Sequence, residues 1–388
     1  MNVQTRPDPV ARARELSAEI TAAADEIERT RRIPDTLLGR LHDSRLFRML
    51  LPRSAGGDET EPAVYAAAIE ELARYDASIG WNAFVANSSA LIAAYLEPAV
   101  NHVIFAQPRS IVAWGPPNAS RARAADGGYR LTGQWDFASG CRQASWLGAH
   151  CHVLEADGAL RLNRFGRPTV RTLLFPASEA TFLDTWHTIG LRGTASDSYT
   201  LNELFVSEAF STTREDPTLR RERGPLYAFT MQGLYATGVA AVALGIARAM
   251  LSEFIGLASR KTPRNLGRLA DNAVVQADVA RAEARLGSAR AYLIETLSAI
   301  YAQADDVAPI DVADRARVRL ATTNAIQGAA EVVDFAYKQA GVDAIFPGSP
   351  FERRFRDMHT LSQQIQARTA HFEAVGQILL GVPPEDFL

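Results

Sequence analysis

The sequence predicts a mainly helical α+β fold: a helical N-terminal domain, a central β-domain and a C-terminal helical bundle. Helical composition fills residues 10–105 and returns from about Pro225, whereas apolar and polar residues alternate in the block between them. Helices, then strands, then helices differ from the alternating order of a dinucleotide-binding domain, and the chain has no G-x-G-x-x-G motif. We place the domains at residues 1–107, 108–212 and 213–388.

The N-terminal domain divides into helices at its Pro- and Gly-containing breaks. Residues 11–31 are rich in Ala and Glu, and Pro34 stands where the next helix begins, since proline fits a first helical turn. Residues 51–57 predict a loop from their proline and glycines. Helical composition then resumes over 61–75 and 78–95.

The central domain is predicted from a period of two. Residues 126–128, Asp-Gly-Gly, predict a turn, and the apolar members of residues 129–137 then alternate with polar ones. Further strand-like runs cover residues 150–154, 172–175 and 198–206.

The C-terminal domain is predicted from helical spacing. One helix has an apolar face made of Val275, Val279, Ala282, Leu286, Ala289 and Leu293. Another is expected over 312–340, with Gly341 as its C-cap. After a loop, a last helix is expected over 351–380.

Composition excludes several classes of function. The net charge of −3 and pI near 6.2 give no basic footprint, so a nucleic-acid partner is not expected. Cys141 and Cys151 lack metal-site spacing and are expected to be reduced thiols, with a disulfide between them as the alternative. The polar residues 1–9 show no signal peptide, and residues 235–251 are too rich in small residues for a membrane span. We therefore expect a soluble, cytoplasmic protein.

Four segments, in order, resemble the acyl-CoA dehydrogenase superfamily. The segment Trp135–Gly140 is most similar to its group D members, the two-component flavin-dependent monooxygenases. The resemblance implies an acyl-CoA dehydrogenase-like fold whose C-terminal domain is a four-helix bundle. The similar segments are Gly128–Gly140, Asp184–Ser196 with Phe205-Val206, Arg260-Lys261-Thr262 with Gln276, and Gly341–Phe346 with Pro350–Asp357.

The resemblance also implies a flavin site. Ser139 would lie near the flavin N5 and C4 atoms as the catalytic hydroxyl that supports a hydroperoxide on C4a, with Trp135 and Phe137 as a water-excluding wall. Arg260 would pair with the flavin phosphate across a subunit interface, because its planar fork binds phosphate oxygens. The alternatives are that Ser139 is only part of a turn after the strand, which we consider the weaker interpretation, and that Arg260 is only a solvated charge, which is as well supported as a phosphate contact. The other implied cofactor contacts are Gly140, Thr194, Gln276 and Gly341.

The usual ionisable base is missing from the sequence. After Arg356-Asp357 there is no Tyr-Glu-Gly-Thr motif, which carries the base in many of the dehydrogenases, and Gln363-Gln364 stands where the hydroxylases often carry Gln-His. His359 is the remaining candidate for a catalytic histidine. Asn87, Trp114 and Gln364 are the candidates for substrate contact.

These features favour oxygenation. A monooxygenase can act on a nucleophilic substrate without a strong base, whereas a dehydrogenase needs a base to remove the α-proton. The resemblance implies an enzyme that takes reduced flavin (FMN or FAD) from a separate reductase and uses molecular oxygen to oxygenate a small aromatic or heteroatom-bearing molecule through a C4a-hydroperoxyflavin. It also implies a homotetramer. The alternatives are an acyl-CoA dehydrogenase or oxidase with bound FAD, and a catalytically idle paralogue that binds flavin or a partner.

Overall fold

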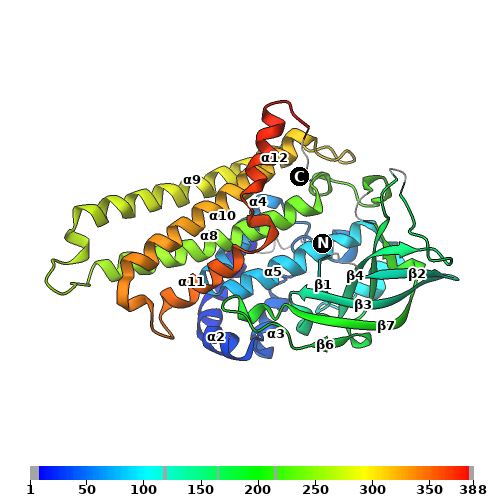
Figure 1. Cartoon of the computed structure of the whole chain (residues 1–388), viewed down its shortest axis with the longest axis horizontal. Helices are drawn as coiled ribbons and strands as arrows, with labels where there is room; N and C mark the ends of the chain where they lie inside the picture. Colours follow the sequence, from blue (N-terminus) through cyan, green and yellow to red (C-terminus); the bar gives the residue numbers. More distant parts are fainter. Residues whose placement is uncertain (1–7, 117–119, 164–165, 214–215, 384–388) are drawn as a thin grey trace, which may run out of the picture.

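The N-terminal part of the chain is helical up to Phe105, as the sequence predicts (Figure 1). The computed structural model describes residues 8–116, 120–163, 166–213 and 216–383. The N-terminal helices are α1 (Pro9–Glu15), α2 (Ser17–Thr30), α3 (Asp35–Asp43), α4 (Pro62–Tyr75), α5 (Ala77–Ala90) and α6 (Pro98–Phe105). Helix α5 is buried along its whole length, so it forms the centre of this domain.

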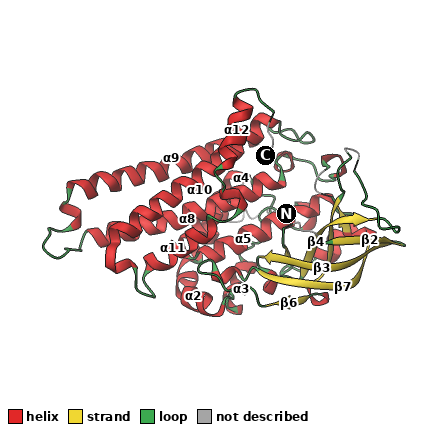
Figure 2. Cartoon of the chain, in the orientation of Figure 1, coloured by secondary structure: helices red, strands yellow, loops and turns green. Residues whose placement is uncertain are grey.

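A single mixed sheet follows, and all four predicted strand runs lie in it (Figure 2). Its strand order is β6-β7-β3-β2-β4-β5-β8, and β1 pairs with β4 in parallel. Alternate residues of β3 are buried, which gives this strand one core face. The strands are β1 (Val112–Trp114), β2 (Arg121–Ala125), β3 (Gly128–Ala138), β4 (Trp146–Leu154), β5 (Val170–Pro176), β6 (Thr181–Leu183), β7 (Asp197–Ser207) and β8 (Ser211–Thr212).

Three long helices dominate the C-terminal part and lie side by side in Figure 1. They are α8 (Met231–Ala258), α9 (Ala273–Gln303) and α10 (Val312–Ala340), and the short α7 (Pro225–Ala228) precedes them. Helix α8 is long and apolar enough to cross a membrane, yet 89% of its most apolar window is buried inside the molecule. Its apolar character is therefore that of a core helix packed against α4, α5 and α10.

The prediction of a single last helix over 351–380 is wrong. The structure has α11 (Pro350–Leu361) and α12 (Ala370–Leu379), with a one-turn 3₁₀ helix at Ile365–Ala367 between them. The Gln364 side chain accepts a hydrogen bond from the Gln366 backbone N–H at 2.6 Å and so caps this turn. The break places the Gln366 side chain in the interior, where it is 1% exposed.

The loop before β7 joins the helices to the sheet. Asp357 of α11 accepts a hydrogen bond from the Leu191 backbone N–H at 2.6 Å. Asn82 of α5 donates to the Gly193 carbonyl at 3.0 Å. A Cβ atom at Gly193 would lie 2.1 Å from Cγ2 of Ile27, so only glycine allows this close approach.

Burial makes the Asp357 contact dependent on pH. It raises the pKa of Asp357 to about 7, and the neighbouring Asp76 carboxylate adds to this increase. The folded state therefore binds a proton that the unfolded chain releases at its ordinary, lower pKa. The stability from this group is complete at acid pH and is lost as the pH rises through about 7.

We expect Asp357→Asn to become more stable relative to the parent protein as the pH rises from 5 to 8. The amide keeps the acceptor for Leu191 but cannot ionise. Urea unfolding at the two pH values measures the difference, and Asp126→Asn in an exposed turn is the control. If the parent gains stability over the variant instead, the folded protein holds Asp357 ionised.

Candidate functional site

The end of β3 presents two side chains in opposite directions. Phe137 has a left-handed backbone (φ 57°) and Gly140 another (φ 75°), and the β3–β7 register shifts between Trp135 and Ala138. This irregular backbone leaves the Phe137 ring 62% exposed and the Ser139 side chain buried at 7% exposure. The strand therefore ends with an exposed aromatic ring beside a buried hydroxyl.

Ser139 belongs to a chain of hydrogen bonds between α5 and the loop before β7. Nε1 of Trp81 donates to Oγ of Ser139 at 3.0 Å. The Ser139 and Ser196 hydroxyl oxygens are 2.6 Å apart, and those of Ser196 and Thr194 are 2.8 Å apart. Oγ1 of Thr194 donates to the Leu191 carbonyl at 2.8 Å.

The direction of this chain follows from its protons. Each hydroxyl has one proton to donate, and the Leu191 carbonyl can only accept. Since Thr194 gives its proton to Leu191, Ser196 must donate to Thr194, and Ser139 must donate to Ser196. Ser139 thus has its proton engaged and accepts from Trp81, which leaves its oxygen one further lone pair with which to accept.

Aromatic rings continue inward from Trp81. The Trp81 and Phe84 ring centroids are 4.8 Å apart, and those of Phe84 and Tyr235 are 5.0 Å apart, both edge to face. Burial raises the pKa of the Tyr235 hydroxyl to about 12, and the nearby Gln364 side chain opposes part of this increase. This aromatic row (Trp81, Phe84 and Tyr235) connects Ser139 to the break after α11.

Sequence reasoning did not single out these three aromatic residues. A usable signal was present for two of them, because Trp81 and Phe84 are three residues apart on a helix and so share one face. Tyr235 comes from a distant part of the chain and required the tertiary structure. Of the predicted site residues, Ser139, Gly140, Thr194 and Gln364 lie along this path, and the Gly140 N–H donates to the Thr194 carbonyl at 2.9 Å.

Two expected contact residues have structural roles instead. Trp135 is fully buried, its ring is stacked on Tyr199 at 5.5 Å, and its Nε1 donates to the His150 carbonyl, so its ring offers no surface to a flavin. Asn87 is also fully buried. Its side chain accepts from the Leu50 N–H at 2.9 Å and donates to the Leu46 and Ala83 carbonyls, so it fixes the loop after α3 and is not available to a substrate.

Two other candidates lie away from the aromatic row. Trp114 packs edge to face on His150 in an apolar cluster of the sheet and α6. His359 pairs with Asp334 at 2.9 Å and packs on the Phe355 ring, with its side chain 38% exposed. The expected catalytic role of His359 is therefore not supported, because its ring is held in a contact between α10 and α11.

The residues predicted to contact the flavin away from its ring, at its phosphate end, lie at the end of the helical bundle that is remote from the sheet. Arg260 follows α8 and Gln276 lies in the first turn of α9, both exposed, and Gly341 ends α10 with φ 60°. Figure 1 shows this end of the bundle opposite the sheet. From Tyr235 to Ala258, α8 rises about 35 Å, farther than the ribityl chain that separates a flavin ring from its phosphate.

Comparison with known proteins identifies the family to which this chain belongs. Residues 10–100 match the acyl-CoA dehydrogenase N-terminal domain model, and residues 237–368 match the C-terminal domain model. Indole-3-acetate monooxygenase of Pseudomonas putida is 31% identical over 94% of this chain and 91% of that protein. The chain belongs to the acyl-CoA dehydrogenase superfamily, among its flavin-dependent monooxygenases.

A second relative by sequence and a solved structure of similar fold support the same family and fold. The oxygenase component of FADH(2)-dependent resorcinol hydroxylase from Rhizobium sp. is 28% identical over 98% of this chain and 97% of that protein. In fold, XiaF from Streptomyces sp., solved with FADH2 and glycerol, superposes with a TM-score of 0.89 at 24% identity over 98% of this chain and 97% of that one. This superposition confirms the predicted acyl-CoA dehydrogenase-like fold.

We expect Asn87→Ala to destabilise the protein by about 3 kcal/mol, because it leaves buried backbone groups around Asn87 without partners. Thr30→Ala, which removes an exposed hydroxyl bond in the same domain, is the control and should change the free energy of unfolding by less than about 0.5 kcal/mol. Denaturant titration measures both. A near-neutral Asn87→Ala would return this residue to the substrate candidates.

Proposed function

We propose that this flavin-dependent monooxygenase places the reduced flavin ring at the end of β3 and an aromatic substrate at the Tyr235 end of the aromatic row. The reduced flavin comes from a separate reductase, and when bound it activates molecular oxygen. The hydrogen-bond chain through Ser139 is the observation that carries this assignment of positions. The two buried free cysteines agree with a cytoplasmic location.

The remaining lone pair of Ser139 suits reduced flavin. In the reduced ring N5 carries a hydrogen and donates, whereas in the oxidised ring N5 can only accept. Because Ser139 is already a donor to Ser196, it is set to accept from N5–H. The exposed ring of Phe137 provides apolar surface beside it, and Trp186 packs edge to face on that ring at 6.3 Å.

The aromatic row suits a flat aromatic substrate. Phe84 is fully buried and supports the rings on either side of it, whereas Tyr235 is partly exposed and can attract another ring through its quadrupole. Gln364 adds a carboxamide that can orient a polar substituent. The names of the two relatives, an indole-3-acetate monooxygenase and a resorcinol hydroxylase, fit an electron-rich aromatic ring that needs no strong base.

Acyl-CoA dehydrogenation is the less favoured alternative. At the break after α11, where the base of a dehydrogenase would be expected, the chain carries the amides Gln363, Gln364 and Gln366. An amide cannot take the α-proton of a thioester.

Anaerobically reduced FMN or FAD, mixed with the protein, indole-3-acetate and isotopically labelled molecular oxygen, tests the proposal. One labelled oxygen atom in the product supports it. Flavin bleaching by a CoA thioester would support dehydrogenation instead, and a protein that binds neither form of flavin would be an idle paralogue.

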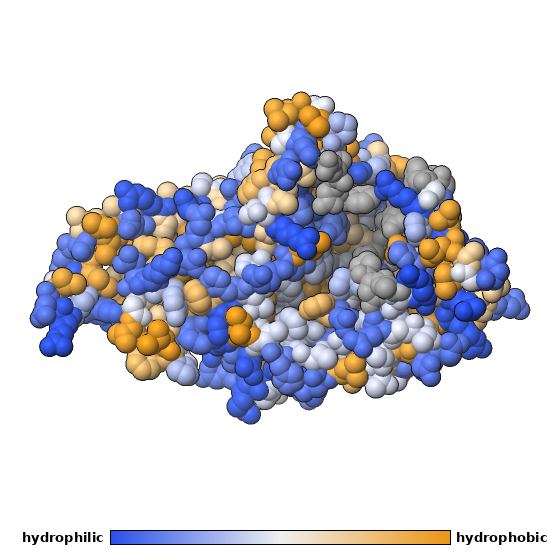
Figure 3. Space-filling view, viewed as in Figure 1, coloured by the Kyte–Doolittle hydropathy of each residue, from blue (hydrophilic) through white to orange (hydrophobic). Residues whose placement is uncertain are grey.

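We further propose a homotetramer whose flavin sites are shared between subunits. The length of α8 separates Arg260, Gln276 and Gly341 from Tyr235, so in this arrangement a neighbouring chain would supply them to the flavin phosphate. Exposed apolar side chains at that end of the bundle support contact with a neighbour (Figure 3), and they include Leu266, Val274, Val342, Ile345 and Phe346.

We expect Ser139→Ala to increase hydrogen peroxide release several-fold relative to product, because the acceptor for the flavin is lost. Ser196→Ala is the matched variant: it frees the Ser139 proton, so Ser139 can donate to the oxidised ring. The ratio of Kd values for oxidised and reduced flavin should therefore fall in Ser196→Ala. Unchanged peroxide release in Ser139→Ala would place the flavin elsewhere.

We expect Phe346→Glu to reduce the oligomer to smaller species and to weaken flavin binding at least tenfold, because a charge is introduced into an apolar contact. Light scattering and flavin titration measure the two effects. Leu162→Glu, a change at an exposed apolar residue of the β-domain, is the control. A tetramer with normal flavin affinity would contradict the shared site.

A further inference from the structure

A cavity lies where the connection between α2 and α3 meets the end of β3 and the loop before β7. Its volume for the centres of water molecules is about 30 Å³, which is room for about two waters. Ile33 and Leu38 line it from the α2–α3 side, and Gly140, Gln143 and Thr194 line it from the two loops. The cavity therefore meets the last residue of the hydroxyl chain that Ser139, Ser196 and Thr194 form.

Two buried polar atoms near the cavity have no protein partner. Nε2 of Gln143 is buried and has no hydrogen-bond partner among the described residues. The same holds within the described ranges for Oδ1 of Asn82, a residue that is 2% exposed. A Cβ atom at Gly140 would lie 3.5 Å from this Nε2 and 3.1 Å from this Oδ1, so a donor and an acceptor flank one glycine. Buried water is the usual partner of such groups in a polar cavity.

The rim of the cavity carries three arginines whose charges are balanced. Each forms a salt bridge with an aspartate, and the pairs are Arg31–Asp184, Arg142–Asp197 and Arg32–Asp35. Because every guanidinium already has a carboxylate, the rim does not form a site for a further anion. The side chains of Arg32 and Arg142 are 60% and 28% exposed, so the rim reaches the solvent.

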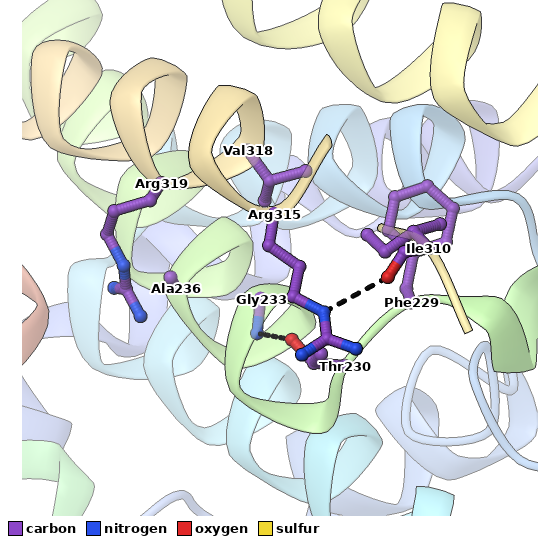
Figure 4. Close-up of a pocket in the computed structure, with 8 residues that line it drawn as sticks. All are labelled: Phe229, Thr230, Gly233, Ala236, Ile310, Arg315, Val318 and Arg319. Carbon is purple, nitrogen blue, oxygen red and sulfur yellow. Dashed lines mark hydrogen bonds between the residues drawn. The ribbon is translucent and has the colours of Figure 1, made fainter. Parts of the chain in front are cut away.

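The cavity between the start of α8 and the first turns of α10 (Figure 4) has no such connection. It has room for about one water, and none of the residues that line it belongs to the hydroxyl chain. Figure 4 shows Arg315 at this cavity, with its Nε bonded to the Ile310 carbonyl at 3.1 Å. It therefore gives Ser139 no route to the solvent.

Every proton of the hydroxyl chain points from Ser139 towards the first cavity. Ser139 donates to Ser196 and Ser196 donates to Thr194, because the Leu191 carbonyl takes the Thr194 proton. A proton that Ser139 accepts can therefore be passed on by one transfer at each hydroxyl. At the end of the chain the Thr194 hydrogen can turn from the Leu191 carbonyl to a water, since a hydroxyl hydrogen rotates to suit its acceptor.

We propose that the hydroxyl chain and the waters of this cavity form a proton relay, which carries the N5 proton of the reduced flavin to the solvent. This inference rests on the proposed function, since it takes the flavin ring to lie at Ser139. Oxidation of the ring requires the N5–H bond to break, because oxidised N5 carries no hydrogen. The relay releases that proton at Thr194.

The balance is simplest without a substrate. Two electrons pass from the reduced ring to molecular oxygen, the N5 proton leaves through the relay, and the oxygen takes two protons from the solvent to become hydrogen peroxide. The relay can therefore be followed whether or not a product forms.

The test mixes protein that holds reduced FMN with oxygen, without substrate, and follows the return of the oxidised-flavin absorbance. We expect Thr194→Val to slow this return at least about tenfold, because it removes the hydroxyl that meets the cavity. Thr194→Ser keeps a hydroxyl and should restore the parent rate. Ser139 keeps Ser196 as its acceptor in Thr194→Val, so the Kd of reduced FMN should stay close to that of the parent. The parent rate should fall in D2O, because exchangeable protons are transferred.

Thr188→Val is the matched control. Thr188 donates to the Gly190 carbonyl at 2.9 Å in the same loop but does not line the cavity, so its variant should keep the parent rate. Leu38→Trp is the second variant if Thr194→Val does not fold. It leaves every hydroxyl in place and fills the cavity with an indole ring, so it should slow the return of oxidised flavin as Thr194→Val does.

A crystal structure of the flavin-free protein provides a readout that is independent of the reaction. We expect ordered water within about 3.2 Å of Nε2 of Gln143 and of Oγ1 of Thr194 in the parent protein. In Leu38→Trp this water should be displaced.

The parent rate in either folded variant would overturn the relay, and so would a parent crystal structure without water at Thr194. If the variants keep the parent rate while labelled oxygen enters a product, the proposed function stands and the relay fails. If the variants slow the return of oxidised flavin while labelled oxygen enters no product, the relay stands and the proposed oxygenation fails. A protein that does not bind reduced flavin would overturn both.

Discussion

The contact between α5 and the loop before β7 determines the geometry of the rest of the site. The Trp81–Ser139 and Asn82–Gly193 hydrogen bonds attach the end of β3 to a helix that is buried along its whole length. Asp357 holds the same loop from α11 through Leu191. The buried position of the Ser139 hydroxyl, where it accepts the Trp81 N–H, follows from these three attachments.

Much of the fold could be predicted from the sequence because its signals are local. The period of two in β3 and the helical spacing in α9 each depend on residues within one element. The break after α11 was missed because nothing in the local composition of residues 351–380 stops a helix. It depends on the distant Arg319, which holds the Gln366 side chain in the interior.

The residues of the candidate site also divide into those that the sequence predicts and those that only the tertiary structure reveals. Ser139 and Thr194 were identified because they stand in segments that resemble the family, and the structure places both in one hydrogen-bond chain. Trp135 was misjudged because strand periodicity does not say which face of a sheet meets the cofactor, and its ring lies in the core. Asn87 was misjudged because a polar residue on a buried helix is equally suited to binding a neighbouring loop.

The two halves of the site are built from different parts of the chain. The end of β3 and its loop surround Ser139, while Tyr235 belongs to α8 and lies near Gln364 at the break after α11. With the flavin at Ser139 and the substrate at Tyr235, as we propose, changes in helix-borne side chains would alter which molecules are accepted and leave the end of β3 intact. Such a division would account for relatives named for compounds as unlike as resorcinol and indole-3-acetate.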